Sequence, residues 1–246
     1  AQLPGINVCG IALHIGSQLT DLAPYRKAYG RTVDFVRVLR AEGIGIEHLD
    51  LGGGLGITYD DEIVPSPAEY GAMATEVVGD LDIKVTFEPG RVIVGNAGVM
   101  VTRVLFVKEG LAKRFCIIDG AMNDLIRPTL YSAHHEIVPV LEPEPASHPV
   151  TMDVVGPICE SGDFIAKERL LPLVGAGDLL AVRTAGAYSA VMSSTYNTRP
   201  LAPEILVNND DFAVVRRRFT VEDMLGLENF PDWLQAETSL RKEDVE

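Results

Sequence analysis

One repeated pattern restricts the fold of this chain more than any other feature. Three apolar segments are each followed at once by a polar or glycine-rich run, and amphipathic segments separate them. We expect these apolar segments to be buried strands: Ile6 to Leu13, Ile46 to Leu51 and Ile83 to Phe87. The β-α-β-α-β order predicts a parallel sheet or part of a barrel, in which ligands bind at the carboxyl ends of the strands.

Two amphipathic helices are expected between these strands. The first covers Pro24 to Glu42, where apolar residues recur three and four positions apart. The second has Ser66 as its N-cap, and Glu69 completes a capping box. Gly79 ends it.

Turn-separated strand candidates replace this alternation after about residue 96. Val92 to Val107 has the composition of one long strand broken by two glycines, and a helix is expected over Val221 to Leu234. Further strands are expected at Arg114 to Ile118, Val150 to Val155, Asp178 to Thr184 and Phe212 to Phe219. Since few helical periods intervene, we predict an antiparallel β domain. The expected domains are residues 1–95 and 96–246.

Charge and cysteine content narrow the class of protein. The net charge of -14 argues against nucleic acid and anionic membranes as partners, because both favour basic surfaces. The three cysteines, Cys9, Cys116 and Cys159, are widely spaced and form neither a disulfide framework nor a zinc pattern. They indicate a reducing cytoplasm. No apolar stretch approaches the length of a membrane span.

The polar runs after the three strands each have a functional and a structural interpretation. His14 and Ser17 can contact a planar ligand and a phosphate, or lie at a simple strand edge. The glycines 52–54 can bring backbone N–H groups around a phosphate, or make a tight turn. Glu88 ends an apolar strand, where a carboxylate needs a partner: a pyridinium nitrogen, or Arg91 in a structural pair.

Polar motifs in the second half have the same two interpretations. Arg127 and Tyr131 can bind a carboxylate, or occupy a surface turn. Cys159, followed by Glu160, can donate a proton or be inert. Tyr188 can hydrogen-bond a ligand or only pack.

Taken in order, these motifs closely resemble the diaminopimelate decarboxylase family, which belongs to the barrel-type pyridoxal-phosphate decarboxylases. The six motifs are His14 to Gln18, Gly52 to Gly54, Glu88 to Arg91, Arg127 to Tyr131, Cys159 to Asp163 and Gly186 to Tyr188. The resemblance implies the C-terminal part of a (β/α)8 barrel that binds pyridoxal phosphate, followed by an antiparallel β domain. It also implies a homodimer with shared active sites that decarboxylates meso-2,6-diaminopimelate to L-lysine.

The resemblance also implies roles for individual residues. Those assigned to the cofactor are His14, Ser17, Gly52, Gly53, Gly54, Glu88, Gly90, Arg91 and Tyr188. Those assigned to the substrate are Arg91, Arg127, Tyr131, Glu160 and Tyr188. His14 stacks on the cofactor ring and Glu88 pairs with its nitrogen. Cys159 is the proton donor, and it reaches the neighbouring subunit's site together with Glu160.

The chain departs from the family at one essential residue. The family carries its Schiff-base lysine in a Tyr-Ala-x-Lys-Ala-like context, and no lysine here has that context. We therefore expect the carboxyl-terminal part of a longer enzyme. Two alternatives stay open: a sister decarboxylase acting on ornithine, arginine or carboxynorspermidine, and a non-catalytic homologue that binds a partner protein.

Overall fold

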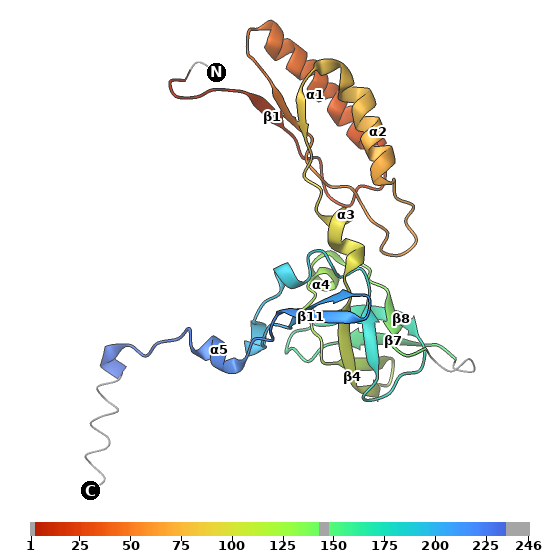
Figure 1. Cartoon of the computed structure of the whole chain (residues 1–246). Coiled ribbons are helices and arrows are strands. Elements are labelled where there is room, and N and C mark those ends of the chain that lie inside the picture. Colours follow the sequence, from red (N-terminus) through yellow and green to blue (C-terminus); the bar gives the residue numbers. More distant parts are fainter. Residues whose placement is uncertain (1–2, 143–147, 235–246) are drawn as a thin grey trace.

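The chain folds around two separate hydrophobic cores. The computed structural model describes residues 3–142 and 148–234. We call residues 10–97 the N-terminal region and residues 100–216 the sheet region; each contains one core. Figure 1 shows the short helix α3 (Arg91–Val94) at the end of the N-terminal region that adjoins the sheet region.

Three parallel strands form the sheet of the N-terminal region. They are β1 (Gly10–Ala12), β2 (His48–Asp50) and β3 (Lys84–Thr86), hydrogen-bonded in that order. The prediction of parallel strands is confirmed, although each strand has only three residues. Backbone bonds from Leu13 N to Asp50 O and from Leu51 N to Thr86 O keep the chain segments aligned beyond the strand ends.

Both predicted helices of this region are present, and they cover one face of the sheet (Figure 1). Helix α1 (Ala23–Ala41) and helix α2 (Pro67–Val78) pack against each other. The predicted capping box is confirmed, because the Ser66 hydroxyl accepts from Glu69 N and the Glu69 carboxylate accepts from Ser66 N. A 3-10 turn, η1 (Gly79–Leu81), follows α2.

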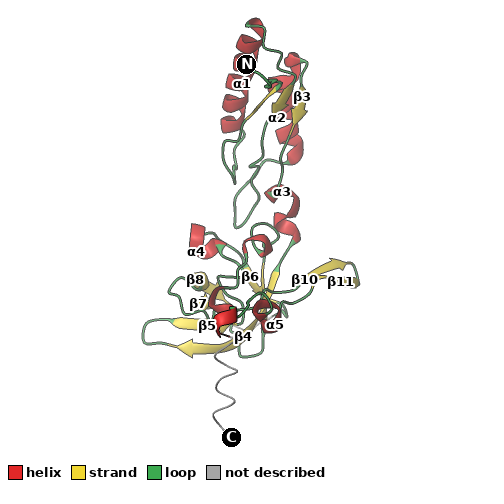
Figure 2. Ribbon diagram, turned by 90° about the vertical axis from the view of Figure 1, so that its left-hand side faces the viewer, coloured by secondary structure: helices red, strands yellow, loops and turns green. Residues whose placement is uncertain are grey.

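Six strands form the larger sheet of the sheet region, in the order β6-β9-β4-β5-β7-β8. Figure 2 labels β4, β5, β6, β7 and β8 in this region. Their bounds are β4 Met100–Glu109, β5 Arg114–Ile118, β6 Ile137–Pro139, β7 Val150–Val155, β8 Phe164–Leu171 and β9 Leu179–Val182. A separate antiparallel hairpin consists of β10 Glu204–Asn208 and β11 Asp211–Arg216. Antiparallel pairs dominate the six-stranded sheet as predicted, and β5 with β7 is its one parallel pair among the described residues.

The prediction of a long strand from Val92 to Val107 is wrong at its beginning. Helix α3 and the 3-10 turn η2 (Gly95–Ala97) occupy that part, and only β4 follows as a strand. Valine and isoleucine favour strands, but tertiary contacts override this preference. Gly95 lies so close to Ile57 that a Cβ would meet the Ile57 side chain at 2.3 Å, so this turn packs closely against Ile57.

Several short elements differ from the sequence-based expectation. Helix α4 (Arg127–Tyr131) was expected as a loop, and β6, β8 and β10 carried no prediction. Three consecutive charged residues, 167–169, interrupt the apolar pattern of β8, so the sequence did not indicate a strand there. Helix α5 (Val221–Leu225) is shorter than predicted because Gly226 ends it. Two further 3-10 turns are η3 (Ala190–Met192) and η4 (Tyr196–Thr198).

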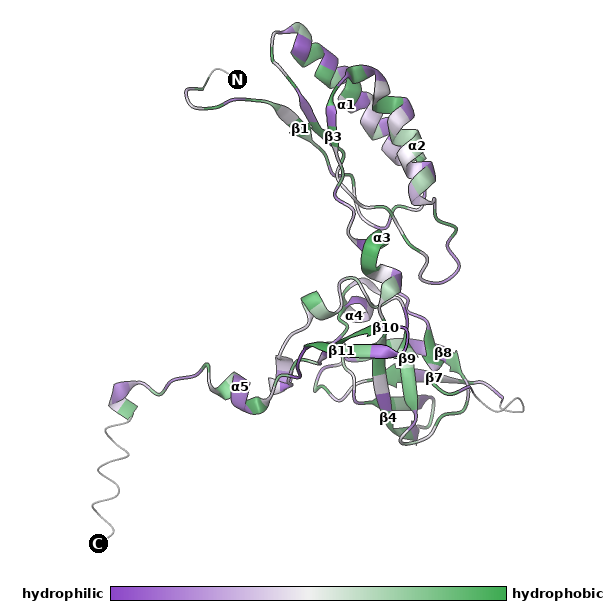
Figure 3. Cartoon of the chain, in the orientation of Figure 1, coloured by the Kyte–Doolittle hydropathy of each residue, from purple (hydrophilic) through white to green (hydrophobic). Residues whose placement is uncertain are grey.

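Apolar side chains remain exposed at the carboxyl-terminal end of the described chain. Figure 3 shows hydrophobic residues along β10, β11 and α5. Phe212 in β11 is 75% exposed, and Phe230, which follows α5, is 76% exposed. Across residues 3–142 and 148–234, no helix combines the length and apolarity that crossing a bilayer requires.

Candidate active site

The glycine triplet brings the three strand ends of the N-terminal region together. A Cβ on Gly52 would lie 2.3 Å from Leu13 O, and one on Gly53 would lie 2.1 Å from Glu88 O. Since neither backbone position has room for a side chain, only glycine allows these segments to meet. The Glu88 N–H also donates to Gly52 O at 2.8 Å. The structure therefore places His14, the triplet and Glu88 side by side at one edge of the sheet.

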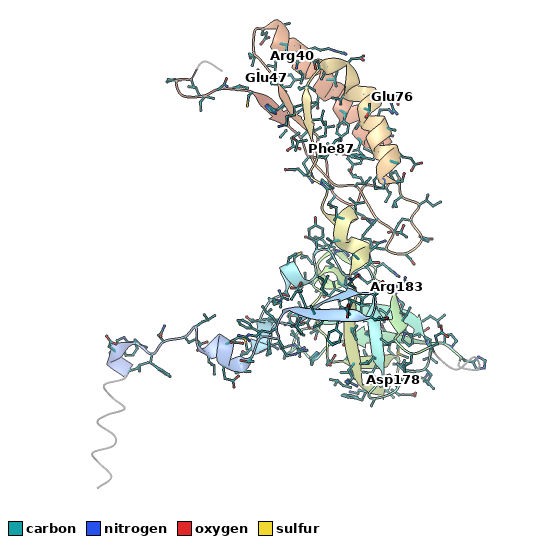
Figure 4. The ribbon with its side chains drawn as sticks, viewed as in Figure 1. Arg40, Glu47, Glu76, Phe87, Asp178 and Arg183 are labelled. Carbon is teal, nitrogen blue, oxygen red and sulfur yellow. The ribbon has the colours of Figure 1, made fainter. Side chains whose placement is uncertain are left out.

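Buried tyrosines of α1 support the triplet from behind. The Tyr25 hydroxyl donates to Gly53 O at 3.2 Å, and the Tyr29 hydroxyl donates to Leu51 O at 3.1 Å. Burial raises the pKa of both phenols well above the ordinary value, so they stay protonated donors. Tyr70 on α2 joins them through a hydroxyl contact with Tyr29, and its ring meets Phe87, which Figure 4 labels beside the sheet. These contacts fix the carbonyls, while the Gly54 N–H has no partner among the described residues.

Arg91 connects the polar strand edge with the sheet region. Its Nη2 donates to Ser17 Oγ at 3.0 Å, and its Nη1 donates to the Tyr59 hydroxyl. Its guanidinium carbon also lies 4.8 Å from the centre of the Tyr188 ring. The alternative of a structural pair between Arg91 and Glu88 is not observed, since the Glu88 side chain is exposed and forms no ion pair within the described residues.

Arg127 is a buried cation at the start of α4. It is 7% exposed, and its guanidinium carbon lies 4.3 Å from the centre of the Tyr59 ring. Its Nη1 hydrogen-bonds His135 Nε2 at 2.8 Å. Burial is the main cause that lowers the pKa of Arg127, and the nearby charge of Arg91 adds to it. A buried arginine usually faces a carboxylate, whereas this one faces an aromatic ring and a histidine.

Two arginines therefore flank one tyrosine ring without a negative charge to balance them. Within residues 3–142 and 148–234, neither Arg91 nor Arg127 forms a salt bridge. The Nε atom of Arg91 is buried and has no hydrogen-bond partner. Unpaired buried guanidinium groups are suited to bind an anion, such as a phosphate or a carboxylate.

Cys159 and Glu160 lie on an exposed turn. Asp163 holds this turn by accepting from Met122 N at 2.7 Å and from Ile158 N at 2.6 Å. The Thr129 hydroxyl donates to Gly162 O, which ties the turn to α4. No hydrogen bond among the described residues joins Cys159 or Glu160 to either arginine.

Two other substrate candidates also reach solvent. Tyr131 is 64% exposed at the end of α4, and Tyr188 is 39% exposed beside Arg91. Sequence reasoning missed Tyr59 and His135, whose contacts appear only in three dimensions. The one available signal was their position a few residues after the glycine triplet and after the Arg127 motif.

A family model matches the part of the chain that contains most of these site residues. Residues 20–186 match the model described as "Pyridoxal-dependent decarboxylase, C-terminal sheet domain". The chain belongs to this family. The fold class predicted from the sequence is confirmed, and the family's cofactor is the pyridoxal group expected above.

The chain is similar to curated relatives over nearly its whole length. It is 50% identical over 228 residues to the diaminopimelate decarboxylase of Neisseria meningitidis serogroup A, and the alignment covers 93% of this chain and 55% of the relative. It is 51% identical over 229 residues to that of Pseudomonas aeruginosa, covering 93% and 54%. The crystal structure of diaminopimelate decarboxylase from Helicobacter pylori complexed with L-lysine aligns with a TM-score of 0.83 and 38% identity, covering 89% and 54%. The chain spans about half the length of the curated relatives it matches.

The residues present fit a pyridoxal phosphate group. Its phosphate suits the unpartnered Gly54 N–H, the Ser17 hydroxyl and the orphaned Nε of Arg91. Glu88, an exposed carboxylate at the same edge, is suited to the ring nitrogen. None of the five described lysines is placed to form the covalent link with the cofactor, because all five are exposed and none contacts these groups.

Proposed function

We propose that the protein carrying this chain is a cytoplasmic, pyridoxal-phosphate-dependent decarboxylase that converts meso-2,6-diaminopimelate to L-lysine and CO2. The principal support is the pair of arginines around Tyr59, which has no carboxylate partner among the described residues. Diaminopimelate carries an amino-acid group at each end. When one end reacts, the other presents a carboxylate that a guanidinium group recognises.

The proposal gives the substrate to residues of the sheet region. Arg127 and Tyr131 bind the distal carboxylate, and Glu160 binds the distal ammonium group. Arg91 and Tyr188 lie between the cofactor and substrate positions. The contacts of Arg91 with both Ser17 and Tyr59 support this intermediate place.

The cofactor belongs to the strand edge of the N-terminal region. Ser17 and the glycines 52–54 hold its phosphate, Gly90 also contacts the cofactor, and His14 stacks on its ring. Glu88 keeps the ring nitrogen protonated. When bound, the cofactor supplies an electron sink for the pair of electrons left as CO2 departs. Cys159 then donates the proton that replaces CO2.

We also infer a homodimer with shared sites and a division of the chain near residue 95. The two separate cores support the division into residues 1–95 and 96–246. The exposure of Cys159 and Glu160, on a turn that Asp163 anchors firmly, supports their action in the neighbouring subunit's site.

Turnover with each candidate amino acid tests the proposal. The protein expressed from the gene that encodes this chain is incubated with pyridoxal phosphate and with diaminopimelate, ornithine, arginine or carboxynorspermidine, and CO2 is measured. We expect release from diaminopimelate. Release from ornithine but not from diaminopimelate would overturn this substrate and favour a sister decarboxylase.

Absorbance spectroscopy separates the enzyme from a non-catalytic homologue. We expect the purified protein to show the visible absorbance of bound pyridoxal phosphate. A protein with neither this absorbance nor CO2 release would instead support the partner-binding alternative.

A further inference from the structure

His135 is the most completely buried ionisable group near the arginine pair. It is 0% exposed, and both ring nitrogens have partners. Nδ1 lies 2.9 Å from the backbone carbonyl of Arg183, a residue labelled in Figure 4. Nε2 lies 2.8 Å from Arg127 Nη1. The imidazole therefore bridges the end of β9 and the substrate-binding candidate of α4.

These two partners determine the protonation of the ring. A carbonyl oxygen only accepts, so Nδ1 carries the hydrogen and donates to Arg183 O. A guanidinium only donates, so Nε2 carries the lone pair and accepts from Arg127. The histidine is therefore neutral. Burial lowers the pKa of His135 to about 4, and the positive charge of Arg127 acts in the same direction.

A neutral acceptor has a specific effect on Arg127. It fixes one edge of the guanidinium without cancelling its charge, whereas a carboxylate in the same place would satisfy the cation internally. The ring of Tyr59 covers one face of the group at 4.3 Å, and its edge-on contact with His135 keeps the two rings 5.3 Å apart. The His135 bond is the one hydrogen bond of the Arg127 side chain among the described residues, so its other donors stay available to a ligand.

We propose that His135 is a positioning residue for substrate specificity, which holds Arg127 charged, unpaired and oriented toward the carboxylate at the unreacted end of the substrate. This inference rests on the proposed function. His135 does not touch the reacting atoms. It acts through Arg127, and it favours ligands with a distal carboxylate over diamines of the same length.

Two inhibitors that differ by one carboxylate provide the test. L-lysine and cadaverine have the same chain of carbon atoms and two amines, but only lysine carries a carboxylate. Their competitive inhibition of CO2 release is measured for the wild type, His135→Glu and His135→Gln, and calorimetry measures lysine binding directly. Circular dichroism verifies that each variant is folded.

We expect His135→Glu to weaken lysine inhibition about tenfold to a hundredfold, the range for a lost charged hydrogen bond, and to leave cadaverine inhibition unchanged or stronger. KM for diaminopimelate rises with kcat nearly constant. His135→Gln keeps an acceptor and a donor, so it restores most of the lysine affinity. If His135→Glu does not fold, His135→Phe replaces it, with the same selective loss expected.

Each contrary outcome has a distinct meaning. Equal losses for lysine and cadaverine in the variants would show a merely structural role and overturn the inference while the proposed function stands. A wild type that binds cadaverine as well as lysine would overturn the distal-carboxylate proposal itself, and this inference with it.

Discussion

The N-terminal region and the sheet region contribute to the same candidate site by different means. The N-terminal region uses backbone: the glycine triplet packs directly on Leu13 and Glu88, and the Gly54 N–H has no partner among the described residues. The sheet region uses long side chains, Arg127 and His135, which are buried and bonded to each other. The backbone site leaves a short motif in the sequence, whereas the side-chain site leaves a motif for Arg127 but none for His135.

Gly53→Ala tests the backbone site and has the largest expected effect. A Cβ here would lie 2.1 Å from Glu88 O, an atom that moves only if the end of β3 moves. We expect the free energy of unfolding to fall by about 3 kcal/mol or more, measured by urea unfolding with circular dichroism.

Gly30→Ala is the matched control in α1, where a Cβ meets no atom within 4 Å. It is expected to stabilise the protein by about 1 kcal/mol or less, because alanine favours helices. Similar losses in both variants would contradict a backbone site that only glycine permits.

Acid tests the side-chain site. The pKa of His135 is about 4 in the folded chain and ordinary in the unfolded chain, so the unfolded state binds more protons between these values. Stability should therefore fall as the pH decreases, by about 2 kcal/mol between pH 7 and pH 5 from this group. Urea unfolding of the wild type and of His135→Gln at both pH values isolates the contribution. An identical pH dependence in the two proteins would show that His135 is not held neutral.

Tyr25→Phe removes one support of the triplet and should have a smaller effect. The buried Gly53 carbonyl loses its phenol donor, which costs about 1 to 2 kcal/mol. Pyridoxal phosphate should also bind more weakly, as measured by absorbance titration. Tyr196→Phe is the control, since that ring is 47% exposed and should tolerate the change. If Tyr25→Phe changes neither the stability nor the affinity for pyridoxal phosphate, the Tyr25 hydroxyl does not support the glycine triplet.

Ser66→Ala affects only the start of α2 and has the smallest expected effect. It removes the hydroxyl that accepts from Glu69 N, at a cost of about 1 kcal/mol. Lysine inhibition should not change, because the hydrogen bonds of the Ser66 side chain go to Glu69, whereas Arg127 is held by His135. A change in lysine inhibition would mean that the two regions respond to each other more than this comparison assumes.

Local signals predicted the elements that depend on neighbouring residues. The capping box at Ser66, the amphipathic period of α1, and the strands β5 and β7 agree with the sequence-based bounds closely. Helix α3 was predicted as a strand because its valines favour strands. The partners of Arg91, Ser17 and Tyr59, lie far from it in the sequence.

The same limit applies to the site. The glycine triplet and Glu88 were recognisable because each follows a strand directly. Tyr59 and His135 were not, since Tyr59 meets Arg91 across 32 positions and His135 meets Arg183 across 48. A single sequence contains no trace of these pairings. The roles of the individual site residues remain predictions for the experiments above.

The Tyr59 ring has a mechanical consequence. It touches Arg91, which α3 carries, and Arg127, which α4 carries, so the two regions cannot rotate against each other without separating one arginine from the ring. An anion bound between the two cations must favour one relative orientation of the regions. By reciprocity, that orientation strengthens the binding of the anion by the same free energy. The restriction of movement at the junction and the affinity for a carboxylate therefore depend on the same coupling free energy.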